Sequence, residues 1–214
     1  MASRGVRIAL ALGLLTVFGS AGAPASEAVR LCRPSGAKVV AIGAQGTVYK
    51  AGRRQDTIRY VACYGRRTKP LFLGGDDCFN ADEPSQFVIA GRLLAYVNTT
   101  CDTVSGSDTV FVVDLRTRKR RYHAAATTTP AARADVYAGV ESLVIARGGE
   151  VAWIATYQVP GGQPRIYEVR RSTPVRGESV LLDSGSDVLP DSLAVSPSLV
   201  YWTRGSAPHS ASLR

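Results

Sequence analysis

Four segments of this 214-residue chain share one pattern: an apolar run that ends in Ile or Val, a short polar or glycine turn, and a second apolar run that carries an aromatic residue. The segments are Val39–Ala51, Gln86–Val97, Ser142–Ala155 and Ser192–Thr203. Their aromatic residues are Tyr49, Tyr96, Trp153 and Trp202, which recur at intervals of 47, 57 and 49 residues. Self-similarity at such a period is typical of folds that stack small similar units, none of which buries its apolar faces alone.

Behind its aromatic residue, each segment continues as further short strand-like runs, and no helical period follows residue 25. The next runs are Thr57–Ala62, Thr109–Leu115, Arg165–Val169 and Ser210–Leu213. Three repeats add a last run, Pro70–Leu73, Tyr122–Ala125 and Ser179–Leu182. Residues 109–115 are apolar on both faces of the run, which indicates a strand packed between two sheets.

This pattern predicts an all-β protein, a small β-propeller of about four blades with four strands each. The blades fall at about residues 36–80, 81–135, 136–187 and 188–214. The last repeat is one strand short, and residues 27–32 would supply that strand and close the ring. Because four blades is the lower limit for a closed propeller, an open or incomplete ring is a second version of this prediction. A two-sheet β-sandwich is the alternative.

Three short motifs inside the repeats resemble the secreted bacterial β-propeller proteins of the TolB type. They are Ala90–Tyr96 (AGRLLAY), Val112–Thr117 (VVDLRT) and Leu199–Trp202 (LVYW). The resemblance covers about residues 36–214 and implies the propeller fold. It implies no particular activity, because propellers carry many unrelated functions.

The first 25 residues have the features of a secretory signal peptide. Arg4 and Arg7 precede an apolar run, Ile8–Phe18, that is too short to cross a bilayer as a helix, and small residues follow up to Ala25. We expect cleavage after Ala25 and a secreted, extracytoplasmic mature domain at residues 26–214. No later segment is long and apolar enough to be a transmembrane helix.

All four cysteines lie in the first half of the mature chain. They are Cys32, Cys63, Cys78 and Cys101. An even number of cysteines in an exported chain predicts two disulfide bonds, and the three possible pairings remain open. Since no C-x-x-C spacing occurs, neither a zinc ribbon nor a thioredoxin-like pair is indicated. We predict no metal and no cofactor.

The formal charge of +9 falls to +7 when the signal is removed, and all of that excess lies before Tyr122. Candidate residues for binding a polyanion are Arg53, Arg54, Arg66, Arg67, Arg116, Arg118, Lys119, Arg120 and Arg121. The last five lie between two predicted strands, where a hairpin tip with solvated charge is the simpler interpretation. No aromatic residues interleave with them, so binding of single-stranded nucleic acid is not indicated.

Candidate catalytic groups are few. They are the acidic pairs Asp76-Asp77 and Asp82-Glu83, the aspartates Asp183 and Asp187, and the histidines His123 and His209. Ordinary turn chemistry explains the aspartates, although paired carboxylates also serve glycosidases and calcium sites. Motifs for nucleophilic catalysis and phosphate loops are absent. We therefore predict no catalytic residue, and we expect the repeat aromatics to lie in the core.

Together these features predict an exported binding or interaction module whose partner is an unknown protein or a cell-envelope polymer. One alternative is a carboxylate-dependent hydrolase or lyase that uses Asp76, Asp77 and Glu83. The other is a polyanion-binding or envelope-binding protein that uses the basic loops. Specific binding of nucleic acid is not expected.

Overall fold

The computed structural model describes residues 32–54, 57–65, 69–75, 83–101, 106–127, 138–157, 164–173 and 178–214. Within this part of the chain every regular element is a β-strand, so the all-β prediction is confirmed. The strands are β1 (Lys38–Ile42), β2 (Gly46–Arg54), β3 (Thr57–Tyr64), β4 (Leu71–Gly75), β5 (Glu83–Ala90), β6 (Leu93–Cys101), β7 (Gly106–Asp114), β8 (Lys119–Ala125), β9 (Ala138–Ile145), β10 (Val151–Tyr157), β11 (Ile166–Ser172), β12 (Ser179–Gly185), β13 (Ala194–Val195), β14 (Leu199–Arg204) and β15 (Ala207–Ser212).

Consecutive strands pair antiparallel as four meanders. Strands β1 to β4 form the first meander, β5 to β8 the second, β9 to β12 the third and β13 to β15 the fourth. One parallel pair, Ser107 with Ala138, joins β7 to β9, so the second and third meanders make one eight-stranded sheet. The meanders follow one another along the chain in the order in which the sequence pattern repeats.

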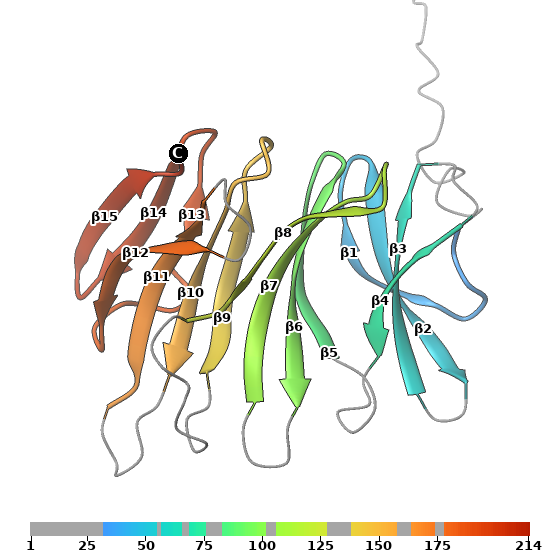
Figure 1. The fold of residues 1–214 in the computed structure, drawn as a ribbon, viewed down its shortest axis with the longest axis horizontal. Helices are drawn as coiled ribbons and strands as arrows, with labels where there is room; N and C mark the ends of the chain where they lie inside the picture. Colours follow the sequence, from blue (N-terminus) through green and yellow to red (C-terminus); the bar gives the residue numbers. More distant parts are fainter. Residues whose placement is uncertain are drawn as a thin grey trace, which may run out of the picture.

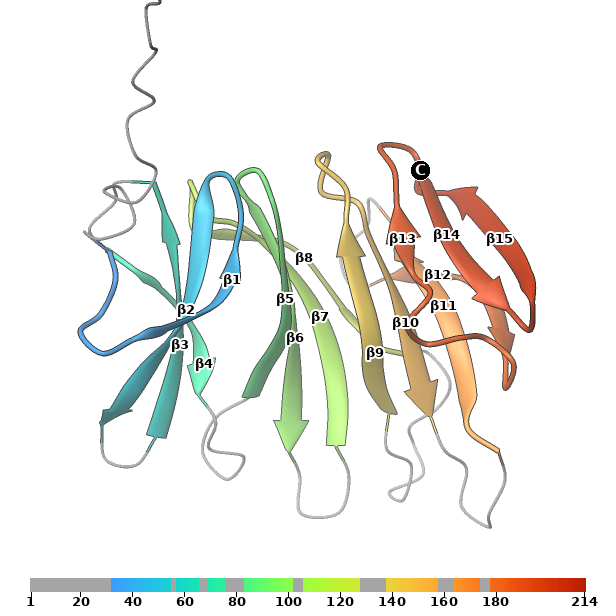
Figure 2. The ribbon, with the colours of Figure 1, turned by 180° about the vertical axis from the view of Figure 1, so that it is seen from behind.

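The meanders stand side by side in a row in chain order (Figure 1). Strands β4, β8 and β12 lie toward the viewer in Figure 1, and β1, β9 and β13 lie toward the viewer after the half turn of Figure 2. In the first and third meanders the first strand therefore lies along one side of the row and the fourth strand along the other. Successive meanders face each other across their broad surfaces, which is where the core forms.

Each inner meander buries both of its faces, as residues 109–115 predict. In β7, Val110 and Val112 pack toward the third meander, whereas Phe111 and Val113 pack toward the first. The two sets alternate because successive side chains of a strand point to opposite faces. The prediction of a strand packed between two sheets is confirmed, and this arrangement makes each repeat depend on its neighbours for a core.

The four repeat aromatics are buried, which confirms that they belong to the core. Tyr96 packs against the first meander, Trp153 against the second and Trp202 against the third. In the described part of the chain, no repeat precedes the first meander to cover its equivalent face, which carries Tyr49. Residues 32–37 cover it instead, since Cys32 and Ala37 are buried in a cluster with Tyr49.

No sheet in the described part of the chain closes into a ring. Of the closing strand predicted at residues 27–32, only Cys32 is described, and it lies in a turn that is disulfide-bonded to Cys63 of β3. Strand β3, which carries Cys63, belongs to the meander at the end of the row opposite to β15 (Figure 1). The two ends of the row therefore differ, with a covered face at the first meander and a three-stranded sheet at the last.

Candidate functional site

A cleft of about 800 Å³ opens where strand ends of the second, third and fourth meanders meet. Its walls come from the β5–β6 turn, from β8, from the β9–β10 turn, from the end of β11 and from the residues after β15. Gly91 and Gly149 have φ values of 60° and 103°, a region that residues with a side chain rarely adopt. These two glycines shape the turns that present Arg92 and Arg147 to the cleft.

The charged residues that line this cleft are mostly arginines. They are Arg92, Arg121, Arg147, Arg171 and Arg214, with Glu150 as the carboxylate. Buried apolar residues, Leu93, Val112 and Leu213, form part of the same lining. We call this site the arginine cleft. A concave surface with five guanidinium groups attracts anions, because the cavity focuses the field of its charges.

A second, smaller hollow of about 400 Å³ adjoins the arginine cleft. It is lined by Arg92, Asp114, Arg116, Thr117, Lys119, Arg120 and Arg121. Most of these residues belong to the β7–β8 hairpin, so we call it the hairpin hollow. The basic run lies on this hairpin, as predicted, but only Arg116 and Arg118 lie in its turn. Lys119, Arg120 and Arg121 begin β8, and all five cations are exposed.

The buried carboxylate of Asp114 organises the boundary between the two hollows. Its Oδ1 accepts hydrogen bonds from the backbone N–H groups of Arg116 and Thr117, at 3.0 and 3.1 Å. Its Oδ2 lies 3.1 Å from Nε of Arg92 and 3.7 Å from Nη2 of Arg121. Asp114 thus folds the hairpin turn and holds the two arginines that line both hollows.

Two buried polar atoms in the lining of the arginine cleft have no hydrogen-bond partner among the described residues. Oε1 of Glu150 accepts a hydrogen bond from Nε of Arg214 at 3.0 Å, but Oε2 has no donor. Nη1 of Arg171 donates to the carbonyls of Ser172 and Leu213, but its Nε has no acceptor. Both atoms lie inside the wall of the cleft with almost no accessible surface, where a polar atom without a partner costs free energy.

Tyr122 is part of the lining of the arginine cleft. Its hydroxyl donates a hydrogen bond to the carbonyl of Glu178. Burial raises the pKa of Tyr122 above its ordinary value, so the phenol stays protonated.

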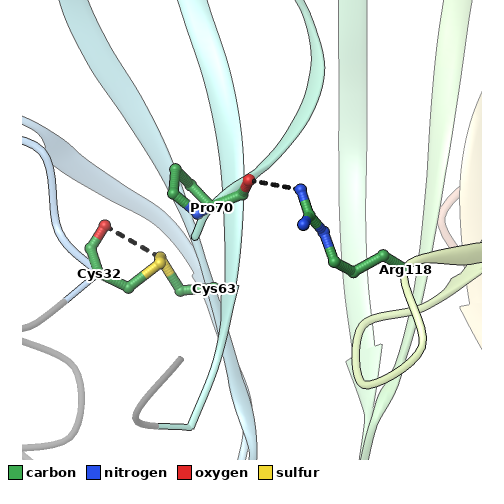
Figure 3. The surroundings of a disulfide bond; sticks show 4 residues. All are labelled: Cys32, Cys63, Pro70 and Arg118. Atoms are coloured by element: carbon green, nitrogen blue, oxygen red, sulfur yellow. Dashed lines mark hydrogen bonds between the residues drawn. A yellow bond between two sulfur atoms is a disulfide. The ribbon is translucent and has the colours of Figure 1, made fainter. Parts of the chain in front are cut away.

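The structure brings the predicted basic residues together only in part. Of the hairpin cations, Arg121 reaches the arginine cleft, whereas Nη2 of Arg118 donates to the carbonyl of Pro70 at 3.1 Å and links the hairpin to the first meander (Figure 3). Arg53 and Arg54 lie in β2, but their side chains are outside the described part of the chain. Arg66 and Arg67 lie outside it altogether.

The other arginines of the cleft were not singled out by the sequence, because none of them lies in a dense basic run. Three of the five, Arg147, Arg171 and Arg214, come from the half of the chain that has no net charge. One signal was available: Arg92 and Arg147 follow Val-Ile-Ala-Gly and Val-Ile-Ala in the turns of two repeats. An arginine in the same turn of two repeats places both cations at the same strand ends of neighbouring meanders, where they line one cleft.

The predicted disulfides are confirmed for one pair, Cys32 with Cys63 (Figure 3). Cys78 lies outside the described residues, and Cys101 ends β6 with its side chain outside them. The second disulfide stays a prediction.

The candidate catalytic residues are not assembled into a site within the described part of the chain. Asp76, Asp77 and Asp82 lie outside it, and Glu83 begins β5 with its side chain outside it. The described residues also hold no cluster of three or more metal-ligating side chains. The ring of His123 stacks on Phe111 and that of His209 on Trp202, in the second and fourth meanders.

Asp183 and Asp187, the two aspartates considered above for a calcium site, both form ion pairs with Arg204. Nη1 of Arg204 lies 2.8 Å from Oδ1 of Asp183, and its Nε lies 3.0 Å from Oδ1 of Asp187. Burial would raise the pKa of Asp183, but hydrogen bonds from Trp202 and Ser184 and the charge of Arg204 outweigh it and hold the pKa below its ordinary value. This ion-pair cluster fastens β12 to β14 and supports a structural role for both aspartates.

Comparisons with protein-family profiles, with curated proteins and with solved structures found no match to this chain. In the described part of the chain, no helix has the length and apolar character needed to cross a bilayer. The candidate site therefore stands on its own geometry and charge.

Proposed function

We propose that this chain is an exported binding module that takes an anionic ligand in the arginine cleft. The observation that carries the proposal is the convergence of five arginines from three meanders around one cavity with a single carboxylate. Guanidinium groups bind carboxylate, sulfate and phosphate groups with paired, charge-assisted hydrogen bonds. The apolar part of the lining would hold the uncharged body of such a ligand.

Export is part of the same proposal. The signal-like segment at residues 1–25 and expected cleavage after Ala25 support it, as does the Cys32–Cys63 disulfide, since such bonds persist in oxidising compartments. We also propose that the mature domain is an open, propeller-like array of four repeats. Three of the repeated aromatics, Tyr96, Trp153 and Trp202, are buried against the preceding meander, and this packing supports that arrangement.

Substitution of one cleft arginine tests the proposal. We expect Arg147→Ala to weaken binding of fluorescein-labelled heparin about five- to tenfold, because it removes one charge-assisted contact with the ligand. Arg165→Ala is the matched control, since Arg165 is also exposed but does not line the cleft. It lies just before β11, whereas the cleft residue Arg171 lies near the other end of that strand. Fluorescence anisotropy at fixed salt measures both affinities.

The control should change the affinity less than twofold, as expected for one screened surface charge. Equal losses in the two variants would show that only the overall positive charge attracts heparin, and would contradict a site in the arginine cleft. Thermal unfolding of both variants checks that the fold is kept.

A further inference from the structure

The arginine cleft and the hairpin hollow are two parts of one positively charged track. Arg92 and Arg121 line both, so a molecule that contacts these two side chains can extend to either side. On one side lie Arg147, Arg171 and Arg214, and on the other lie Arg116, Lys119 and Arg120. A single small anion would engage only a fraction of these cations. The track fits a linear ligand that carries charges at intervals along its length.

The chemistry of the cleft distinguishes between classes of linear polyanion. Glu150 places a carboxylate among the arginines of the lining, where its Oε1 accepts a hydrogen bond from Nε of Arg214. A chain of phosphates carries a charge on every unit, and this dense charge would be repelled by Glu150. A sugar chain with spaced acidic groups can instead place uncharged hydroxyls, which are both donors and acceptors, beside that carboxylate.

The uncharged part of the lining fits a sugar as well. Leu93, Val112 and Leu213 are buried, apolar and part of the cleft lining. The C–H face of a sugar ring can pack on such a surface, whereas its carboxylate or sulfate group binds the arginines. Apolar lining with a few well-placed polar groups is the usual composition of a small-molecule site.

We infer that the ligand is a linear acidic polysaccharide that lies across both hollows, with an uncharged part of the chain on the apolar floor of the arginine cleft. This inference rests on the function proposed above and names its ligand class. Asp114 is a positioning residue in this scheme, because it holds Arg92 and Arg121 where the two hollows meet.

Ligand length and class provide the first test. Two series would be titrated at fixed salt, oligogalacturonates with carboxylates and heparin oligosaccharides with sulfates, each from disaccharide to octasaccharide. We expect affinity to rise at least about tenfold with length until the ligand spans both hollows, because each added contact is made within one complex. Polyphosphate of matched charge should bind about tenfold more weakly than the better glycan series.

The outcomes separate this inference from the proposed function. If disaccharides bind as tightly as octasaccharides, the ligand occupies one hollow, so the linear track is wrong while the anion site stands. If polyphosphate or single-stranded DNA binds more tightly than both glycan series, the assignment to polysaccharide is wrong. If none of these anions binds, the proposed function itself fails. The series that binds better shows whether the cleft prefers the carboxylates of oligogalacturonates or the sulfates of heparin.

Asp114→Asn provides a test in which a positioning role and a pure net-charge effect predict opposite changes in affinity for the octasaccharide. The substitution removes one negative charge and so raises the net charge of the protein by one. A purely electrostatic surface would therefore bind the octasaccharide more tightly. We expect about five- to tenfold weaker binding instead, because Arg92 and Arg121 lose the carboxylate that orients them. Asp191→Asn, at an exposed position outside both hollows, is the matched charge control. Tighter binding by Asp114→Asn would overturn the positioning role.

Glu150→Gln tests the hydroxyl contacts in the same way. We expect it to weaken octasaccharide binding about threefold to tenfold and to strengthen polyphosphate binding, because it replaces a charged acceptor by a neutral one. A change in the same direction for both ligands would contradict the proposed contact with a sugar hydroxyl.

Discussion

Replacement of Trp153 by alanine is expected to lower the free energy of unfolding by about 3–5 kcal/mol, the range found when a large core aromatic is removed. The indole ring is fully buried between the second and third meanders. Its Nε1 donates a hydrogen bond to the carbonyl of Ala126 at 2.7 Å. Loss of the ring would leave a cavity at the contact through which the two repeats stabilise each other.

Two further variants separate the contributions to this effect. Trp153→Phe keeps much of the ring and loses the N–H donor, so it should cost about 1–3 kcal/mol. Tyr201→Ala removes an aromatic residue that is 40% exposed on β14 and should cost less than about 1 kcal/mol. Chemical denaturation with the disulfide intact measures all three. A cost for Trp153→Ala no greater than that for Tyr201→Ala would contradict packing of the repeats through their aromatics.

Replacement of Glu168 by alanine is expected to cost a similar amount, about 3–5 kcal/mol, for an electrostatic reason. Glu168 and Arg170 point to the same side of β11, and their side chains are only 4% and 2% exposed. Oε2 of Glu168 lies 2.7 Å from Nη1 of Arg170. Without the carboxylate, the buried guanidinium of Arg170 loses the negative charge that lies 2.7 Å from it, and denaturant unfolding measures the loss of stability.

The double variant Glu168→Leu with Arg170→Met shows whether the lost charge is the cause. Because it removes both buried charges, we expect it to recover most of the stability lost in Glu168→Ala. A double variant as unstable as the single one would show that packing, and not the lost charge of Glu168 beside Arg170, determines the cost.

Much of the fold can be predicted from the sequence, because the repeat period of the aromatic residues and the alternation of apolar side chains along a strand both indicate which residues are buried. The apolar faces of residues 109–115 correctly indicate a strand between two sheets, and the spacing of the aromatics correctly places them in the core. The structure that covers the outer face of the first meander could not be predicted, because the alternation of apolar side chains defines which face is buried and not what covers it. That residues 32–37 cover the face of Tyr49 depends on a disulfide whose pairing the sequence leaves open.

The candidate site was predicted less well than the fold. The basic run at residues 116–121 is correctly placed on a hairpin, since a dense charge run between two strands has few other positions. The arginine cleft depends on single residues from turns far apart in the chain, such as Arg92, Arg147 and Arg171. Counting charge by halves of the sequence hides them, because the row brings both halves to the same cavity.

The site and the fold are therefore linked. No single meander forms the arginine cleft, since its arginines come from the second, third and fourth meanders. Variants that separate the repeats, such as Trp153→Ala, should also reduce ligand binding at temperatures where they still fold, because the arginines would no longer be held around one cavity.

Backbone hydrogen–deuterium exchange with and without saturating heparin tests the anion site most directly, because it reports which strand ends the ligand covers. We predict slower exchange in the β9–β10 turn at Arg147–Glu150 and at the end of β11 at Arg171–Thr173, with no change before β11 at Arg165. Protection confined to the tip of the β7–β8 hairpin, or spread evenly over the chain, would contradict a ligand site in the arginine cleft.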